Sequence, residues 1–204
     1  DIIKEGFWYT DPCEYLPSDY ESYKNEIIFG VGQTFINSHE ELGYCFELAG
    51  AEAHYKHLNE LIEDPSIMDR YQGAGLPGGF TMGDQLGAGQ SVSNRIRNSK
   101  LRDKLYEKFN DNNFPIYCVC NWLQILAKLD LFPIPVGTRQ NDSGKHETSF
   151  WDVKVNKNNE TVWLSLLKAY QGPIFAPISH GEGRIAVSED LLKTVEEKNL
   201  VALT

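Results

Sequence analysis

One cysteine stands where the chain changes from a strand pattern to a helix pattern, and it is the residue best placed for nucleophilic chemistry. Pro115 to Val119 is apolar and favours a strand, whereas Asn121 to Leu129 has the spacing of an amphipathic helix, and Cys120 lies between them. Such a turn exposes the side chain at the carboxyl end of an α/β sheet, and the helix N-terminus favours the thiolate. The backbone N–H of Asn121 can then point at a developing oxyanion. The pattern predicts a nucleophilic thiol, although a cysteine at the end of a buried strand is more often a core residue.

A second segment is rich in glycine. Pro77-Gly78-Gly79-Phe80 is followed by Gly83-Asp84 and by Gly87-Ala88-Gly89. Glycines after a strand let the backbone approach a ligand closely and can supply a second oxyanion donor, while a flexible surface loop would have the same composition. A phosphate-binding loop is excluded, because no Gly-Lys-Ser/Thr sequence follows.

A third segment, Ile178 to Arg184, carries polar groups and glycines after a predicted strand. Ser179, His180 and Gly181 at a strand end can bind a small zwitterion, since open α/β sheets bind ligands at such ends. A lone histidine is more often structural, but neighbouring serine and glycine favour a binding site.

The elements that must position these residues follow from hydrophobic periodicity. The predicted strands are Ile27–Gly32, Ala53–Leu58, Gly73–Pro77 and Pro115–Val119, and the predicted helices are Glu40–Ala49, Val92–Phe109 and Asn121–Leu129. Their alternation indicates a parallel sheet with helices on both faces. In the first helix the predicted buried face consists of Leu42, Cys45, Phe46 and Ala49.

The pattern changes after Pro133. Strands are predicted at Ser149–Val155, Val162–Leu166 and Ile174–Ile178, a helix at Ser188–Lys198, and the start of another strand at Val201–Leu203. Ser188 is predicted to cap its helix, and the acidic residues that follow suit a first helical turn.

Composition limits the class of protein. The chain has 204 residues, enough for one domain with a full core, and its net charge of −10 argues against nucleic-acid and anionic-membrane binding. No apolar run is long enough to span a bilayer. The four cysteines, Cys13, Cys45, Cys118 and Cys120, lack the spacings of a disulfide framework or a zinc site, so we expect a cytoplasmic protein without a metal.

Several stretches occur together, and in this order, in one protein family. They are Phe46–Glu52, Pro77–Gly89, Asn94–Arg97, Cys120-Asn121, Gln124–Leu126, Asn141–Gly144 and Ser179–Arg184. On these stretches the chain resembles the glutaminase subunit or domain of phosphoribosylformylglycinamidine synthase, a class I glutamine amidotransferase of purine synthesis. The resemblance implies a three-layer, flavodoxin-like α/β domain with a mostly parallel central sheet over residues 25–204. Residues 1–24, which have no counterpart, are interpreted as an N-terminal extension.

The resemblance also implies a reaction. Cys120 would attack the side-chain amide of glutamine to give a glutamyl thioester and ammonia, with the N–H groups of Gly79 and Asn121 holding the oxyanion. The groups that would hold the amino-acid end of glutamine are Gln124, Ser179, His180 and Gly181. Ammonia would pass to an ATP-dependent synthetase partner that aminates formylglycinamide ribonucleotide. No cofactor is expected in the glutaminase itself.

Two departures from the family pattern leave three interpretations. The family elbow reads Gly-x-Cys-Asn-Gly, but Cys118 and Trp122 replace its glycines, and the catalytic His-Pro-Glu motif is not found in the sequence. We therefore expect the domain to lack the family's C-terminal segment. The first interpretation is an amidotransferase whose C-terminal segment is missing from this chain through truncation, processing or omission. A degenerate, non-catalytic subunit for partner binding is the second interpretation. A relative recruited to another amidation or amide hydrolysis, with Trp122 shaping its pocket, is the third.

Overall fold

The computed structural model describes residues 26–31, 38–80, 86–87, 89–165 and 167–204. Residues 1–24, predicted to form an extension, lie outside this range. The chain divides into two compact units, the first formed by residues 1–83 and 96–119 and the second by residues 84–95 and 120–204. Each unit is described by itself. No helix among the described residues combines the length and the apolar character needed to cross a membrane.

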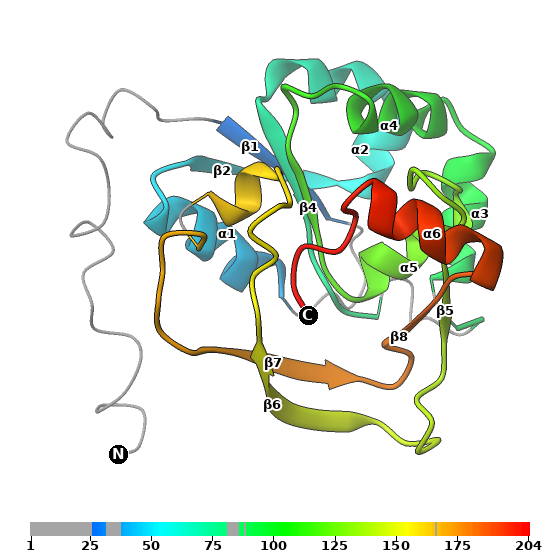
Figure 1. Cartoon of the computed structure of the whole chain (residues 1–204). Coiled ribbons are helices and arrows are strands. Elements are labelled where there is room, and N and C mark those ends of the chain that lie inside the picture. Colours follow the sequence, from blue (N-terminus) through cyan, green and yellow to red (C-terminus); the bar gives the residue numbers. More distant parts are fainter. Residues whose placement is uncertain (1–25, 32–37, 81–85, 88, 166) are drawn as a thin grey trace, which may run out of the picture. The chain divides into compact units, whose positions relative to one another are not determined.

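The first unit is built on a parallel sheet. Its strands are β1 (Glu26–Val31), β2 (Glu52–His57), β3 (Gly73–Leu76) and β4 (Ile116–Cys118), hydrogen-bonded in the order β2-β1-β3-β4 (Figure 1). All three pairings are parallel. The four strands predicted from alternation in this part are confirmed, and with them the α/β class. The inner strand β3 is buried along its whole length, and a Cβ atom at Gly73 would lie 2.9 Å from the carbonyl oxygen of Pro115.

Helices connect these strands. They are α1 (His39–Leu48), α2 (Leu58–Glu63), the 3₁₀ helix η4 (Pro65–Arg70) and α4 (Leu101–Phe109). The chain reverses direction across the sheet after β2, so right-handed crossovers put α1 on one face and the other helices on the opposite face. Figure 1 shows α2 and α4 together, away from α1. The sequence did not predict α2 or η4, because six residues are too few for a clear helical period.

The buried face of α1 was predicted only in part. Phe46 is buried, and it packs with the partly buried Leu42 and with Ala51 and Ala53. Cys45 and Ala49, which were predicted on the same face, are exposed. The apolar stripe of this helix is narrower than its sequence indicated.

The helix predicted over Val92–Phe109 is wrong in its continuity. It is two helices, α3 (Gln90–Arg97), which crosses the boundary between the units, and α4. Ser99 ends the first of them, because its hydroxyl donates to the carbonyl oxygen of Ile96 at 2.9 Å. The same hydroxyl accepts from the N–H of Leu101 at 3.3 Å, so a serine side chain replaces helical backbone bonds at the break.

A cluster of charged side chains ties α4 to η4. Lys104 Nζ lies 2.9 Å from a carboxylate oxygen of Asp69 and 2.9 Å from one of Glu107, while Lys108 Nζ lies 3.0 Å from Asp69. Lys108 is buried, and its ammonium group lies 4.7 Å from the centroid of the Phe114 ring. The hydrogen bonds from Lys104 and Lys108 hold the pKa of Asp69 below its ordinary value of 3.8. The hydrogen bonds to Glu107 and Asp69 raise the pKa of Lys104.

We expect Asp69→Asn to lower the free energy of unfolding by about 1 kcal/mol at neutral pH, because the carboxylate pairs with both Lys104 and Lys108. The effect is no larger because the Asp69 side chain is half exposed. Its contribution is present above the ordinary carboxyl pKa of 3.8 and is lost as the pH falls through the lowered folded-state value. The free energies of unfolding of wild type and variant, measured with denaturant, should therefore become equal in acid. Asp103→Asn is the matched control, since Asp103 is 85% exposed and 3.9 Å from Arg102. Equal losses in both variants would contradict the role of the cluster.

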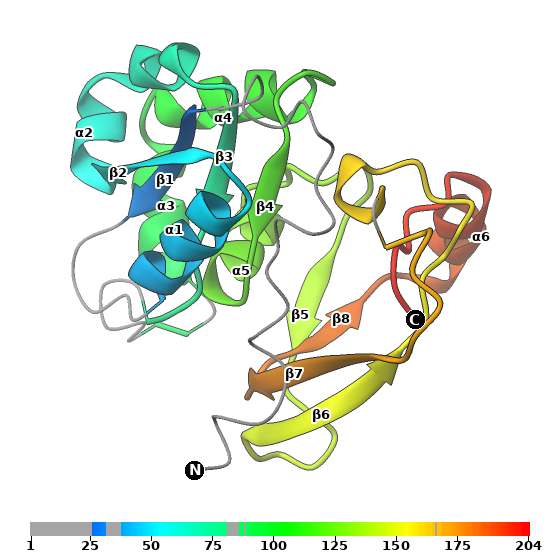
Figure 2. The same ribbon diagram turned by 90° about the vertical axis from the view of Figure 1, so that its left-hand side faces the viewer.

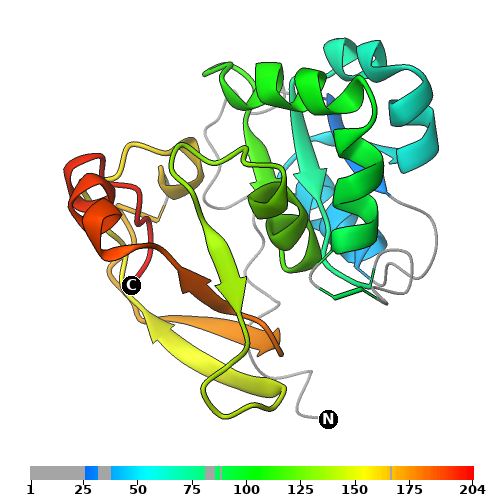
Figure 3. The same ribbon diagram turned by 90° about the vertical axis from the view of Figure 1, so that its right-hand side faces the viewer.

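The second unit contains α5 (Asn121–Lys128), η6 (Val162–Leu164), α6 (Glu189–Glu197) and two antiparallel ribbons. In the first ribbon β5 (Gly137–Arg139) pairs with β8 (Arg184–Ala186), and in the second β6 (Glu147–Val153) pairs with β7 (Ile174–His180) (Figure 2). Figure 3 shows β6 and β7 side by side from the opposite direction. The best-buried helix of this unit is α5, through Trp122, Ile125 and Leu126.

Two strand predictions in this unit are corrected. Residues 162–164 form η6 instead of a strand, with the N–H of Leu164 bonded to the carbonyl oxygen of Thr161. The predicted strand start at Val201–Leu203 is reduced to one antiparallel bridge between Val155 and Leu203. The helix predicted after Ser188 is confirmed as α6, but the Ser188 side chain makes no capping hydrogen bond. The strands β5 and β8 were not predicted, because neither segment contains an apolar run.

Candidate active site

The structure places Cys120 between the end of β4 and the start of α5. Its φ is 51° and its ψ is −111°, close to the first central position of a type II′ turn, which glycine dominates. A side chain with a Cβ is strained there, and such strain is typical of nucleophile elbows. The Cys120 side chain is exposed, and its carbonyl oxygen accepts from the N–H of Gln124 at 3.2 Å. The backbone therefore presents this thiol outward at a helix N-terminus.

The other cysteine of the elbow is in a different state. Cys118 ends β4, and burial raises the pKa of its thiol to about 11. A thiol with that pKa stays protonated near neutral pH and is a poor nucleophile. Cys118 is partly buried and Cys120, two positions later, is exposed, so the two thiols differ in the chemistry that they can perform.

Asn121 and Gln124 connect the elbow helix to the polar segment that follows β7. The side-chain Nδ2 of the buried Asn121 donates to Oε1 of Gln124 at 3.1 Å. The Nε2 of Gln124 donates in turn to the carbonyl oxygen of Glu182 at 3.4 Å. Residues predicted separately as oxyanion donor and as substrate-binding groups are therefore joined in one chain of hydrogen bonds. The N–H of Asn121 is also in the first turn of α5.

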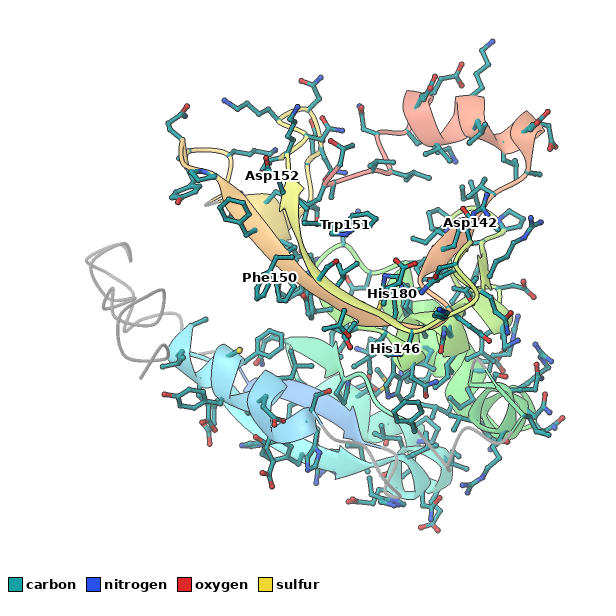
Figure 4. The ribbon with its side chains drawn as sticks, turned by 90° about the horizontal axis from the view of Figure 1, so that it is seen from below. Asp142, His146, Phe150, Trp151, Asp152 and His180 are labelled. Carbon is teal, nitrogen blue, oxygen red and sulfur yellow. The ribbon has the colours of Figure 1, made fainter. Side chains whose placement is uncertain are left out.

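Ser179 and His180 lie at the end of β7, and their side chains leave on opposite faces of the β6–β7 ribbon. Ser179 Oγ is 2.9 Å from Nε2 of His146 and 3.3 Å from Oγ1 of Thr148. His180 is half-buried, and its Nδ1 lies 3.0 Å from Oδ1 of Asn141. Figure 4 shows His146 and His180 at the same end of the ribbon. A ligand bound on one face of the ribbon can therefore contact the side chain of Ser179 or that of His180, but not both.

Asn141 is a member of this polar cluster for which no role was predicted. It is 8% exposed and bonds to the backbone on both sides of Gly181. The neighbouring Asp142 forms an ion pair with Arg184. The Asn-Asp-Ser-Gly stretch from residue 141 was noted only for the family resemblance, and residues of these types, which are common in turns, carry no signal for a buried amide.

The glycine-rich segment is described only in part. Gly79 has a φ of 141° and is half-buried in the first unit, where the hydroxyl of Ser38 donates to the carbonyl oxygen of Gly78 at 2.9 Å. Gly83, Asp84 and Ala88 lie outside the described residues. The assignment of Gly79 as an oxyanion donor therefore stays a prediction.

Trp122, which replaces a glycine of the family elbow, is a core residue. It is 1% exposed, and its Nε1 has no hydrogen-bond partner among the described residues. Within the described ranges, no three His, Cys, Asp or Glu side chains gather in a way that would hold a metal ion.

Comparisons with known proteins agree on one family. The CobB/CobQ-like glutamine amidotransferase domain matches residues 30–204. A phosphoribosylformylglycinamidine synthase subunit PurQ from Dehalococcoides mccartyi is 34% identical over 158 residues, which cover 74% of this chain and 60% of the relative. A PurQ subunit from Methanococcus maripaludis is 30% identical over 177 residues, covering 83% of this chain and 62% of the relative. The chain thus spans about three fifths of the length of these relatives.

A solved structure gives the same result. The structure of PurLQS from Thermotoga maritima aligns with a TM-score of 0.65 and 27% sequence identity, covering 82% of this chain and 71% of that one. The two chains are therefore alike in sequence as well as in fold.

Proposed function

Because the chain belongs to the CobB/CobQ-like glutamine amidotransferase domain family, we propose that it is the glutaminase part of a phosphoribosylformylglycinamidine synthase. It hydrolyses glutamine and delivers the ammonia to an ATP-dependent synthetase, which aminates formylglycinamide ribonucleotide in purine synthesis. The PurQ names of the curated relatives and the PurLQS structure support this assignment. As part of the same proposal, residues 25–204 form a three-layer, flavodoxin-like domain in a cytoplasmic enzyme, and residues 1–24 are an extension.

In the proposed reaction, the Cys120 sulfur attacks the side-chain carbonyl carbon of glutamine. The bond from that carbon to the amide nitrogen breaks, the thiol proton leaves with the nitrogen, and the products are ammonia and a glutamyl thioester. Water then cleaves the thioester to glutamate and restores the thiol. The N–H groups of Asn121 and Gly79 stabilise the oxyanion in both steps. Gln124 and the segment Ser179–Gly181 hold the amino-acid end of the substrate.

The observation that carries this proposal is the backbone of Cys120. A cysteine with a φ of 51° at the start of a helix is costly unless something requires its side chain at that position. Exposure of this thiol and burial of Cys118 support the choice between the two.

A glutamine-mimicking electrophile, such as a chloroketone analogue, tests the assignment. We expect one adduct per chain near neutral pH, mapped to the peptide that contains Cys120 and suppressed by excess glutamine. Cys118→Ser should be labelled like wild type, because the Cys118 thiol is protonated and buried. The exposed Cys45 on α1 serves as an internal control for non-specific alkylation. Equal labelling of Cys45 and Cys120, without protection by glutamine, would reject the proposal.

A second function, a non-catalytic amidotransferase-like subunit that binds a partner, is favoured by Trp122. A buried indole stands two positions after Cys120, where the family pattern has a glycine. Assays of ammonia release with and without the synthetase subunit separate the two functions. The catalytic proposal expects glutamine-dependent release in the complex, whereas the non-catalytic one expects complex formation and no release.

A further inference from the structure

The buried amide of Asn141 makes four side-chain hydrogen bonds. Its Nδ2 donates to the carbonyl oxygens of Lys145 at 2.9 Å and His180 at 2.8 Å. Its Oδ1 accepts from the N–H of Gly183 at 3.3 Å and lies 3.0 Å from Nδ1 of His180. Its backbone N–H adds a bond to the carbonyl oxygen of Gly181 at 3.1 Å. One side chain therefore fixes the backbone on both sides of residues 181–182.

The orientation of this amide follows from its partners. Both neighbours of Nδ2 are carbonyl oxygens, which only accept, and the N–H of Gly183 can only donate. A flipped amide would place Oδ1 against two carbonyl oxygens and Nδ2 against an N–H group. The observed orientation is the one that satisfies every partner.

This orientation determines the tautomer of His180. Because Oδ1 of Asn141 only accepts, Nδ1 of His180 must carry the proton that joins them. In the neutral imidazole Nε2 is then unprotonated and accepts hydrogen bonds. The ring also packs closely on Gly183, where an added Cβ would overlap it, so its position is fixed as well as its proton.

We propose that Asn141 is a positioning residue that holds His180 as the Nδ1–H tautomer, so that Nε2 accepts a hydrogen bond from the ammonium group of bound glutamine. This inference rests on the proposed function and names the substrate group that His180 recognises. An ammonium group only donates and a carboxylate only accepts, so an unprotonated Nε2 selects the ammonium end. Gln124 and the elbow helix join the same segment through the carbonyl oxygen of Glu182.

The tautomer can be measured directly in the full chain by long-range ¹H–¹⁵N NMR of the histidine rings. We expect wild-type His180 to show a protonated Nδ1 and an unprotonated Nε2. Asn141→Leu should disturb this state, because leucine keeps the size of the side chain but offers no acceptor for the Nδ1–H of His180. A wild-type spectrum with Nε2–H would overturn the inference without any variant, even if Asn141→Leu fails to fold.

Glutamine binding, followed by calorimetry on the same proteins, is the second readout. We expect Asn141→Leu to weaken binding by about tenfold or more, the effect of losing one hydrogen bond to a charged group. Asn159→Leu is the matched control, since Asn159 is also 8% exposed and its Nδ2 donates to the carbonyl oxygen of Asn199. His180→Asn keeps a donor for Asn141 but removes the group at the Nε2 position, and it should weaken binding to a similar extent.

The outcomes separate the inference from the proposed function. Equal glutamine affinity in wild type, Asn141→Leu and His180→Asn would reject the role of Asn141 and His180 and leave the proposed function standing. If the wild-type protein binds no glutamine, but the Nδ1–H tautomer of His180 is lost in Asn141→Leu, the proposed function and the ammonium contact are rejected. The control of the His180 tautomer by Asn141 would then still hold.

Discussion

Replacing Cys120 with glycine is expected to raise the free energy of unfolding by about 1 kcal/mol and to abolish thioester formation in the same protein. Cys120 has a φ of 51° and a ψ of −111°, a conformation that glycine adopts without steric cost. Release of about 1–3 kcal/mol of backbone strain outweighs the greater flexibility that glycine gives the unfolded chain. Loss of the sulfur removes the nucleophile. Stability and activity are therefore expected to change in opposite directions.

Cys120→Ala is the control that separates the two effects. Alanine removes the thiol but keeps the Cβ, so activity should be lost without a gain in stability. Denaturant unfolding of the three proteins measures the first quantity, and labelling by a glutamine-mimicking electrophile measures the second. Equal stabilities of the glycine and alanine variants would show that the elbow is not strained. Undiminished labelling of either variant would show that another residue is the nucleophile.

The sequence predicted those elements whose apolar period is long enough to read. The four parallel strands of the first unit, α1, α5 and α6 were found in this way. The break at Ser99 was missed, since a serine hydroxyl that bonds to the preceding turn leaves the apolar spacing on both sides unchanged. The short strands β5 and β8 were missed for a different reason. Neither contains an apolar run, and their pairing joins segments more than forty residues apart.

The candidate site shows the same division. The strand-to-helix position of Cys120 could be predicted, because a local change of period marks it. Its positive φ could not, since no glycine stands there to signal it. The role of Asn141 depends on four hydrogen bonds to three residues, the farthest of them 42 positions away, and only a folded chain brings these together. Local patterns identify residues that begin or end elements, but they do not identify buried polar groups that hold loops in place.

Trp122 gives the prediction with the largest effect on stability. Under the third interpretation, in which Trp122 shapes the pocket, exchanging it for the glycine of the family pattern would be expected to improve glutamine turnover. The indole is 1% exposed, so the exchange also removes a core side chain. We expect Trp122→Gly to lose about 3–5 kcal/mol of unfolding free energy from the cavity and about 1 kcal/mol more from glycine within a helix. Full stability of this variant, measured by denaturant unfolding, would place the ring outside the core.

Trp122→Phe separates the volume of the indole from its N–H group. The Nε1 atom has no partner among the described residues, and a buried donor without a partner costs about 1–3 kcal/mol. Phenylalanine removes that cost but leaves part of the indole volume empty, so we expect a net change within about 1 kcal/mol. A loss of about 2 kcal/mol or more would mean that the N–H group makes a stabilising hydrogen bond that phenylalanine cannot replace. Only then would the polar edge of this ring, as well as its bulk, contribute to the elbow beside Cys120.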